Sequence, residues 1–248
     1  RSLLVILFLA CTTFWALQRP GKSLLESKRY SRWVTIWLGL TVVAFLSHSF
    51  WVYSFAASVV LITQHQREKN PVALYLFLLF LIPPGFAEIP GFGLINYLFL
   101  LNHPRLLSLF LLFPALLVLR QQTDSKRFGS LTADKFIIIY IAISLILNFR
   151  ATTFTDTLRE ALYLCTDIAL PYYVTSRGLQ TIKHFQEAMF GFLLATFILA
   201  AVAIVESLKH WLLYFPLTGA LDLSFDLAIY LGRADMLRAI ATPGQAIA

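Results

Sequence analysis

Two arginines near the end of the chain are the residues best suited to chemistry. Arg233 and Arg238 lie in the segment 232–238 (GRADMLR), shortly before another apolar run. Arginine binds phosphate through paired hydrogen bonds and stays charged when partly buried. At a membrane boundary, two arginines fit a diphosphate, which needs charge neutralisation when it leaves. We therefore expect Arg233 and Arg238 to bind a substrate diphosphate; the alternative is that they only anchor the next helix.

Four other ionisable residues lie in or beside apolar blocks, where charge is costly and usually faces a cavity or a partner. Asp167 lies inside one block and Glu206 ends another. Arg159 precedes the Asp167 block, and Arg150 follows the block before it. We expect these residues to support the site; the alternative is pairing that fixes helix packing.

The sequence predicts neither a metal site nor a cofactor. Two of the five histidines, His65 and His184, have a glutamate three residues later, Glu68 and Glu187. No third ligand is near, so both pairs are expected to be solvated loop charges. The phosphate-binding and dinucleotide-binding glycine motifs and the serine nucleophile motif of hydrolases do not occur. A nucleotide enzyme or hydrolase of the soluble type is not predicted, and no catalytic residue is identified.

Both cysteines and two further histidines are expected to have no chemical role. Cys11 and Cys165 both fall in apolar blocks, which predicts small core residues rather than a disulfide. His48 and His103 are expected to be interfacial or loop residues rather than bases.

Apolar blocks supply the elements that position these residues. The chain is 58% hydrophobic and 13% charged, against about 45–50% and about 25% in soluble domains. The blocks are 2–17, 33–63, 71–87, 106–119, 136–149, 161–175 and 188–205. A full span needs about 20 residues, although shorter blocks span where the bilayer thins. This pattern predicts an all-α, polytopic integral membrane protein with about eight membrane-inserted helices.

The block 33–63 is too long for one ordinary span and carries Ser47, His48 and Ser49 at its middle. We expect a helical hairpin, 33–46 and 50–63, with one long tilted helix as the alternative. Lysine and arginine favour cytoplasmic loops. With the hairpin, every dense basic loop falls on one face, whereas a single helix would invert everything that follows it. The outer face then carries Arg105, Arg150, Arg159, Lys209, Arg233 and Arg238.

The segments outside the spans complete the predicted organisation. The proline- and glycine-rich segment 83–93 is expected at the outer interface or partly re-entrant, and 207–239 is expected to be extracytoplasmic. Residues 1–248 form one transmembrane domain, expected to be truncated at both ends because both ends lie in or beside apolar runs. The net charge of +7 is attributed to topology and to contact with membrane lipids, and no nucleic-acid partner is predicted.

The segment 238–246 resembles the Arg-x-x-Gly-x-x-x-Pro type of stretch that opens the conserved half of the O-antigen ligase and O-antigen polymerase family. Ala241 and Gln245 stand where Gly and Pro are usual. Glu206 followed by Trp211 and Tyr214 after an apolar block is also similar.

The resemblance implies a multi-pass glycosyltransferase of the bacterial inner membrane that acts on the periplasmic face. It would ligate or polymerise a polyprenyl-diphosphate-linked glycan onto a lipid or glycan acceptor. It implies that Arg238 holds the donor diphosphate, with Arg233 as a second candidate. The family's large periplasmic loop would follow Ala248, so this fragment alone is expected to be inactive.

Two other functions stay open. A multi-spanning transporter for a small anion is favoured by Asp167, by the broken segment 83–93 and by the outer arginines. Inverted repeats would support it, and none is found. A scaffold for polysaccharide assembly would tolerate the loss of both Arg233 and Arg238.

Overall fold

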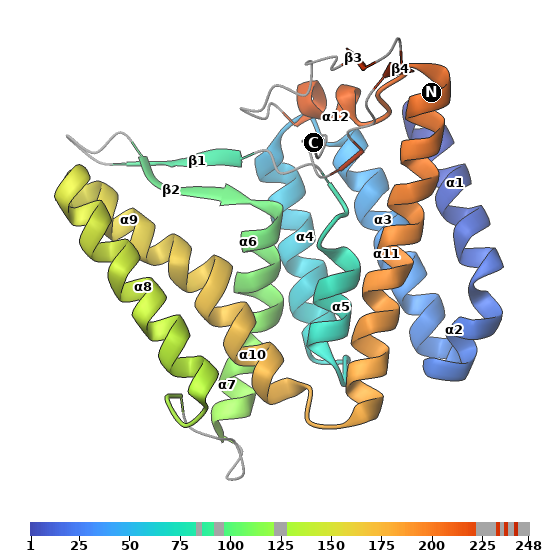
Figure 1. Cartoon of the computed structure of the whole chain (residues 1–248). Helices are drawn as coiled ribbons and strands as arrows, with labels where there is room; N and C mark the ends of the chain where they lie inside the picture. The colour runs from blue at the N-terminus through green and yellow to red at the C-terminus, as the bar shows by residue number, and fades with distance from the viewer. Residues whose placement is uncertain are drawn as a thin grey trace.

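In the computed structural model the chain forms a helical bundle with a β-hairpin across one end (Figure 1). The structure describes residues 1–82, 86–91, 97–121, 128–221, 232–233, 236–237 and 241–242, and only the backbone at 151, 232, 233, 236 and 237. The described residues are mostly helical, which confirms the main part of the all-α prediction.

The helices run back and forth between two ends of the bundle (Figure 1). They are α1 (Ser2–Ala16), α2 (Gln18–Leu24), α3 (Ser27–Leu46), α4 (Phe50–His65), α5 (Pro71–Leu78), α6 (His103–Leu107), α7 (Phe113–Gln121), α8 (Thr132–Ala151), α9 (Phe154–Leu164), α10 (Leu170–Gly178), α11 (Ile182–Lys209) and α12 (Phe215–Ala220). We call the end with α2 and the turns after α4, α7 and α10 the basic end. The opposite end, with α12 and the turn between α3 and α4, is the hairpin end.

Short polar side chains begin several of the helices. The hydroxyl or amide oxygen of such a residue accepts a backbone N–H that the first helical turn leaves unpaired. Caps of this kind are Ser49 on α4, Asn70 on α5, Asn102 on α6, Thr153 on α9 and Thr181 on α11. A proline in the first turn, Pro71 in α5 and Pro104 in α6, adds a preset backbone angle where no N–H is needed. At α6, α9 and α11 these starts lie before the apolar blocks of the sequence.

The predicted hairpin in 33–63 is confirmed. Helix α3 ends at Leu46, α4 begins at Phe50, and Ser49 caps the start of α4. The two helices contact each other and run in opposite directions (Figure 1). All the basic turns that this hairpin was expected to bring to one face lie at the basic end, except that Lys126 and Arg127 fall outside the described residues.

Two of the long helices contain a π-helical turn. The turn η1 (Ser108–Leu112) joins α6 to α7, and η2 (Cys165–Ala169) joins α9 to α10. The two turns contact each other although they lie far apart in the sequence. A π turn widens a helix locally and occurs frequently at functional sites. The contact between η1 and η2 therefore makes the surroundings of Asp167, which lies on η2, a candidate functional region.

A β-hairpin occupies part of the segment expected to be irregular. Strand β1 (Phe86–Pro90) pairs antiparallel with β2 (Tyr97–Asn102), with Phe86 opposite Asn102. Helix α5 ends at Leu78, well inside the apolar block 71–87. Two short strands, β3 (Gly232–Arg233) and β4 (Met236–Leu237), form a second pair, and β4 lies against α11. The strands correct the expectation of an entirely helical chain.

The core is built where α11 packs against α5 and α1. Trp33 stacks on Phe77, with ring centroids 5.4 Å apart, and Phe77 meets Phe14 edge-on. All three rings are buried. Gly191 on α11 lies so close to α5 that an added Cβ would be 2.6 Å from the carbonyl oxygen of Ala73. Aromatic rings and one close glycine thus join helices from both halves of the chain.

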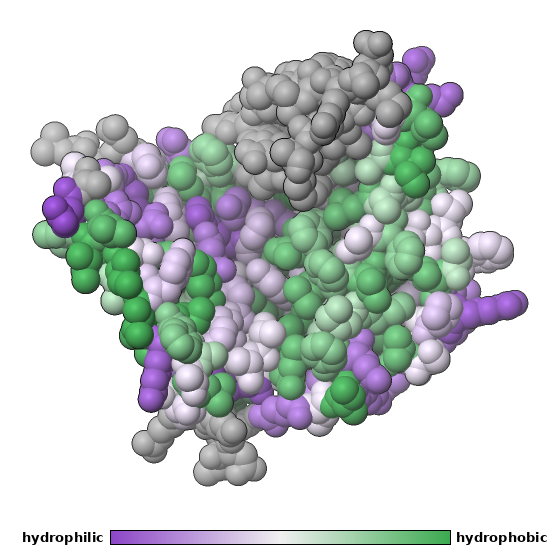
Figure 2. Space-filling model, viewed as in Figure 1, coloured by the Kyte–Doolittle hydropathy of each residue, from purple (hydrophilic) through white to green (hydrophobic). Residues whose placement is uncertain are grey.

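Among the described residues, three helices are long and apolar enough to cross a membrane: His103–Gln121, Thr132–Arg150 and Ile182–Lys209. A fourth is added if α1 and α2, bent by 59°, count as one span. Figure 2 shows apolar residues over α8 and α11. Cys11 and Cys165 are exposed on the chain's surface, so the prediction that they are core residues is wrong. Their small side chains face outward from apolar helices.

Candidate functional site

An arginine–aspartate pair lies next to the π turns, where α6 meets η2. Arg105, in the first turns of α6, donates to both carboxylate oxygens of Asp167 on η2, at 2.8–3.1 Å. It also donates to the carbonyl oxygen of Leu100 at 2.6 Å. Its guanidinium lies 3.8 Å from the ring centroid of Tyr163. The Arg105 side chain is 11% exposed and that of Asp167 38%, so the carboxylate keeps one side open.

Arg159 makes a second link between α9 and the β-hairpin. Its guanidinium donates to the carbonyl oxygen of Tyr97 at 2.6 and 3.0 Å and lies 4.0 Å from the Tyr97 ring centroid. It also pairs with Asp156 at 2.5 Å. The Tyr163 hydroxyl accepts the backbone N–H of Leu100. These contacts tie the strand β2 to α9 and η2.

The predicted supporting residues therefore have different environments. Asp167 and Arg159 are paired, so the alternative of pairing that fixes packing describes both of them. Arg150 lies in the last turn of α8, is exposed, and forms no ion pair within the described part of the chain. These three residues do not converge on one point. Arg105, which the sequence analysis placed on the outer face without a role, is the partner that joins Asp167 to the hairpin.

Glu206 connects the end of α11 to the segment that carries the predicted diphosphate site. Its side chain is buried, and its carboxylate accepts the backbone N–H of Leu213 at 3.0 Å and that of Ala241 at 2.8 Å. Ala241 belongs to the family-like stretch 238–246. Glu206 was expected to support the diphosphate site; this contact places its carboxylate against the backbone of the stretch, and the supporting role stays a prediction. Arg238 lies outside the described residues, and only the backbone of Arg233 is described, on β3.

A buried ion cluster at the basic end was missed by the sequence analysis. Arg29 on α3 donates to Glu68, after α4, and to Glu187 on α11, the latter at 3.0 Å. Arg32 and the Trp33 indole N–H also donate to Glu68, at 2.7 and 3.0 Å. The Asn70 amide donates to Glu187 at 3.2 Å. We call Arg29, Arg32, Glu68, Asn70 and Glu187 the Arg29 cluster.

The Arg29 cluster overturns the expectation that Glu68 and Glu187 are solvated loop charges. Both glutamates are buried, at 8% and 3% exposure, because arginines from α3 neutralise them inside the bundle. A second buried pair lies nearby: Arg177 on α10 and Asp134 on α8, with a closest distance of 2.6 Å. Asp134 also accepts the backbone N–H groups of Gly129 and Leu131, which fixes the start of α8.

His103 is a buried residue, so the expectation of an interfacial or loop position is wrong. Its side chain is fully buried, with Nδ1 2.9 Å from the Tyr53 hydroxyl and Nε2 2.9 Å from the carbonyl oxygen of Leu78. These contacts join α4, α5 and α6. His48 is exposed in the turn before α4, as expected. Within the described residues, no group of three or more His, Cys, Asp or Glu side chains is arranged to hold a metal ion.

Comparison with known proteins adds no relative. No family model, curated protein or solved structure matches the chain.

Proposed function

We propose that the chain is the membrane domain of a glycosyltransferase that ligates or polymerises a lipid-diphosphate-linked glycan on the outer face of the bacterial inner membrane. The contact between Glu206 and the backbone of Ala241 carries this proposal. It ties the stretch that resembles the O-antigen ligase and polymerase family to the end of α11, which is long and apolar enough to span.

The hydrogen bond between Glu206 and the backbone of Ala241 supports a role for Arg238 at the membrane boundary. Ala241 is three positions after Arg238 in the sequence, and three residue steps extend over at most about 11 Å. A guanidinium on this stretch would meet a diphosphate at headgroup level, where the lipid carrier keeps it. In the transfer, an acceptor hydroxyl oxygen bonds to the anomeric carbon and releases its proton to water, and the carbon–diphosphate bond breaks. The diphosphate leaves with the bonding electrons, and Arg238 stabilises its charge.

The arrangement of basic turns supports the orientation. The positive turns gather at the basic end, which we assign to the cytoplasm because lysine and arginine favour cytoplasmic loops. The hairpin end, with Glu206, then faces outward. In this proposal about eight segments are inserted: α1, α3, α4, α5, α6 to α7, α8, α9 to α10, and α11. Those too short to span by themselves are accommodated by local thinning and by snorkelling of flanking side chains.

A labelling experiment tests the orientation. In a chain whose Cys11 and Cys165 are replaced by serine, Ser130→Cys is expected to be shielded from a membrane-impermeant maleimide added outside intact cells. His48→Cys, an exposed position at the opposite end, is expected to react. Permeabilised cells provide the control, because both positions should then be labelled. The reverse pattern in intact cells would place the hairpin end in the cytoplasm and contradict the proposal.

An arginine substitution tests the chemistry in the full-length protein. Arg238→Ala is expected to reduce glycan transfer by about 100-fold or more, because a positioned cation that stabilises a leaving group contributes on that scale. Transfer is measured with a labelled lipid-linked donor, and insertion by the thiol-labelling pattern. The matched control is Arg19→Ala, an exposed arginine at the basic end, which should transfer normally. Normal transfer by a correctly inserted Arg238→Ala protein would remove Arg238 from the mechanism.

A transporter for a small anion is the second candidate. It is favoured by α5, which starts at the basic end and stops after eight residues. Interrupted helices are frequent at the substrate sites of transporters. Anion uptake into proteoliposomes, in the absence of any glycan donor, distinguishes this function from glycan transfer.

A further inference from the structure

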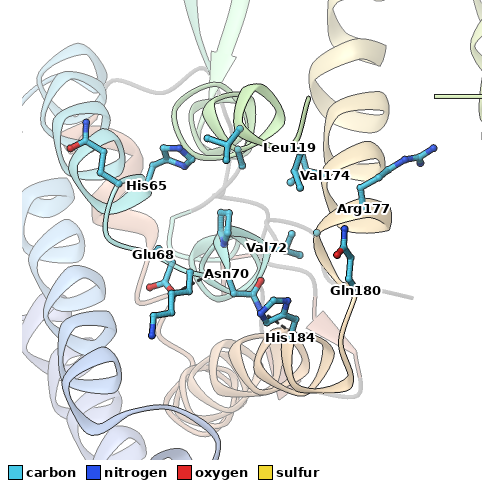
Figure 3. A pocket seen from close by; sticks show the side chains of 15 residues that line it. His65, Glu68, Asn70, Val72, Leu119, Val174, Arg177, Gln180 and His184 are labelled. Carbon is cyan, nitrogen blue, oxygen red and sulfur yellow. Dashed lines mark hydrogen bonds between the residues drawn. The ribbon is translucent and has the colours of Figure 1, made fainter. Parts of the chain in front are cut away.

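A cavity of about 580 Å³ lies at the basic end, lined by residues that include neither Glu206 nor any residue of the β-hairpin. Figure 3 shows its lining side chains. The end of α4, the start of α5, α7, α10 and the start of α11 surround it. Nothing in the proposed transfer reaction uses it, since the diphosphate site belongs to the opposite end of the bundle.

The walls of the cavity differ in polarity. Apolar side chains from α5, α7 and α10 form one part: Val72, Ala115, Val118, Leu119 and Val174. Polar side chains come from the end of α4 and the turn after it, from α10, and from the start of α11 with the turn before it: His65, Gln66, Glu68, Lys69, Asn70, Arg177, Gln180 and His184. Arg177 is already paired with Asp134. Figure 3 shows His65 and His184 on opposite sides of the cavity, with Val72, Leu119 and Val174 also lining it. The ligand that fits such walls is an amphiphile.

The polar wall favours an anionic group. Glu68, its one carboxylate, is neutralised by Arg29 and Arg32. The Lys69 side chain is 71% exposed, and within the described residues its ammonium pairs with the exposed Glu26, a contact that water weakens. The Nδ1 atom of His65 is buried and has no hydrogen-bond partner within the described residues. A lysine with a weakly held ammonium and an imidazole nitrogen without a partner among the described residues thus belong to the lining of a cavity whose carboxylate is already balanced.

The apolar wall continues onto the surface that lipid would contact. Val118 lines the cavity and is 48% exposed, and Leu117 beside it is 46% exposed. Both lie on α7, inside the apolar helix His103–Gln121. An acyl chain could therefore follow α7 while its headgroup enters the cavity. A free phosphate ion would leave the apolar wall unused.

We propose that this cavity binds an anionic phospholipid. The phosphate lies near Lys69, His65 and His184, and an acyl chain lies along Val118. Basic pockets between membrane helices on the cytoplasmic side are known to hold acidic lipid headgroups. The bound lipid would connect α4, α7, α10 and α11 at one end of the bundle.

Native mass spectrometry of the detergent-purified chain tests the proposal. The chain is offered equal amounts of phosphatidylglycerol and phosphatidylcholine, and retained lipids are counted. Phosphatidylglycerol is expected to be retained at least about fivefold more than phosphatidylcholine, since one basic group near an anionic headgroup changes affinity on that scale. The double variant Lys69→Gln, His184→Gln is expected to lose this preference. The matched control, Lys209→Gln with His48→Gln, changes the same residue types at the opposite end and should keep it.

Two further arms separate the possible sources of phosphate and the role of the apolar wall. Inorganic phosphate is added at a large excess and is expected to displace little lipid. Val118→Trp is expected to reduce phosphatidylglycerol retention while the unfolding temperature stays unchanged. Equal retention of both lipids, an undiminished preference in the double variant, or full displacement by inorganic phosphate would each overturn the proposal.

Discussion

Replacing Glu68 with alanine is expected to destabilise the folded chain by about 3–5 kcal/mol, because removal of one partner leaves buried charge uncompensated. Glu68 accepts hydrogen bonds from Arg29, Arg32 and the indole of Trp33. In the variant Arg29 keeps only Glu187, and the Trp33 N–H has no acceptor. Reversible unfolding in mixed micelles of mild detergent and sodium dodecyl sulfate gives the change in the free energy of unfolding.

Glu26→Ala is the matched control for this substitution. Glu26 lies at the same end of the bundle, and a hydrogen bond from Lys69 lowers the pKa of its carboxyl. Both of these side chains are exposed, so the pair is screened by water and contributes little. A much smaller change is expected for Glu26→Ala. Equal unfolding free energies for the two variants would show that the Arg29 cluster does not hold the bundle together.

Replacing Gly191 with alanine is expected to cost about 1–3 kcal/mol, the usual range for an added methyl group in a packed interior. The new Cβ would lie 2.6 Å from the Ala73 carbonyl oxygen and 3.2 Å from the Trp33 ring. The first contact is with backbone, so α5 itself must move away from α11. Small residues allow such close helix approach in membranes. The same unfolding assay measures the loss.

Gly39→Ala is the control for Gly191→Ala. Gly39 lies within α3, and an added Cβ there meets nothing within 4 Å. Alanine favours helix over glycine by about 1 kcal/mol, so this variant is expected to be neutral or more stable. If both variants changed stability alike, the close approach of α11 to α5 would not be the cause.

The features that the sequence predicts correctly are those with a local signal. The turn between α3 and α4 follows from polar residues in an apolar block. The β-hairpin was not predicted, although it also has a local signal. The apolar run ending at Leu101 is bounded by glycines and by Asn102, as strands often are. Asn102 with Pro104 likewise indicates that α6 starts at His103.

The features that the sequence does not predict depend on partners far along the chain. Glu68 and Glu187 have the local appearance of loop carboxylates, and only the return of α11 to α3 brings them to Arg29. The same holds for Asp167, whose partner Arg105 lies 62 residues earlier. Because a lone carboxylate looks alike when solvated or ion-paired, no periodicity or composition distinguishes the two states.

The sequence spacing of the Arg29 cluster has a consequence for folding during translation. Arg29 precedes Glu68 by 39 residues and Glu187 by 158. At about 5–20 residues per second of translation, α3 exists for roughly 8–32 s before the ribosome delivers its last counter-ion. During that interval the start of α3 holds a cation whose final neutralising partner has not been made. Synthesis of α11 therefore completes the neutralisation of Arg29 and Glu68 in the first half of the chain. A ribosome that stalls before Glu187 would leave a nascent chain in which the Arg29 cluster cannot form.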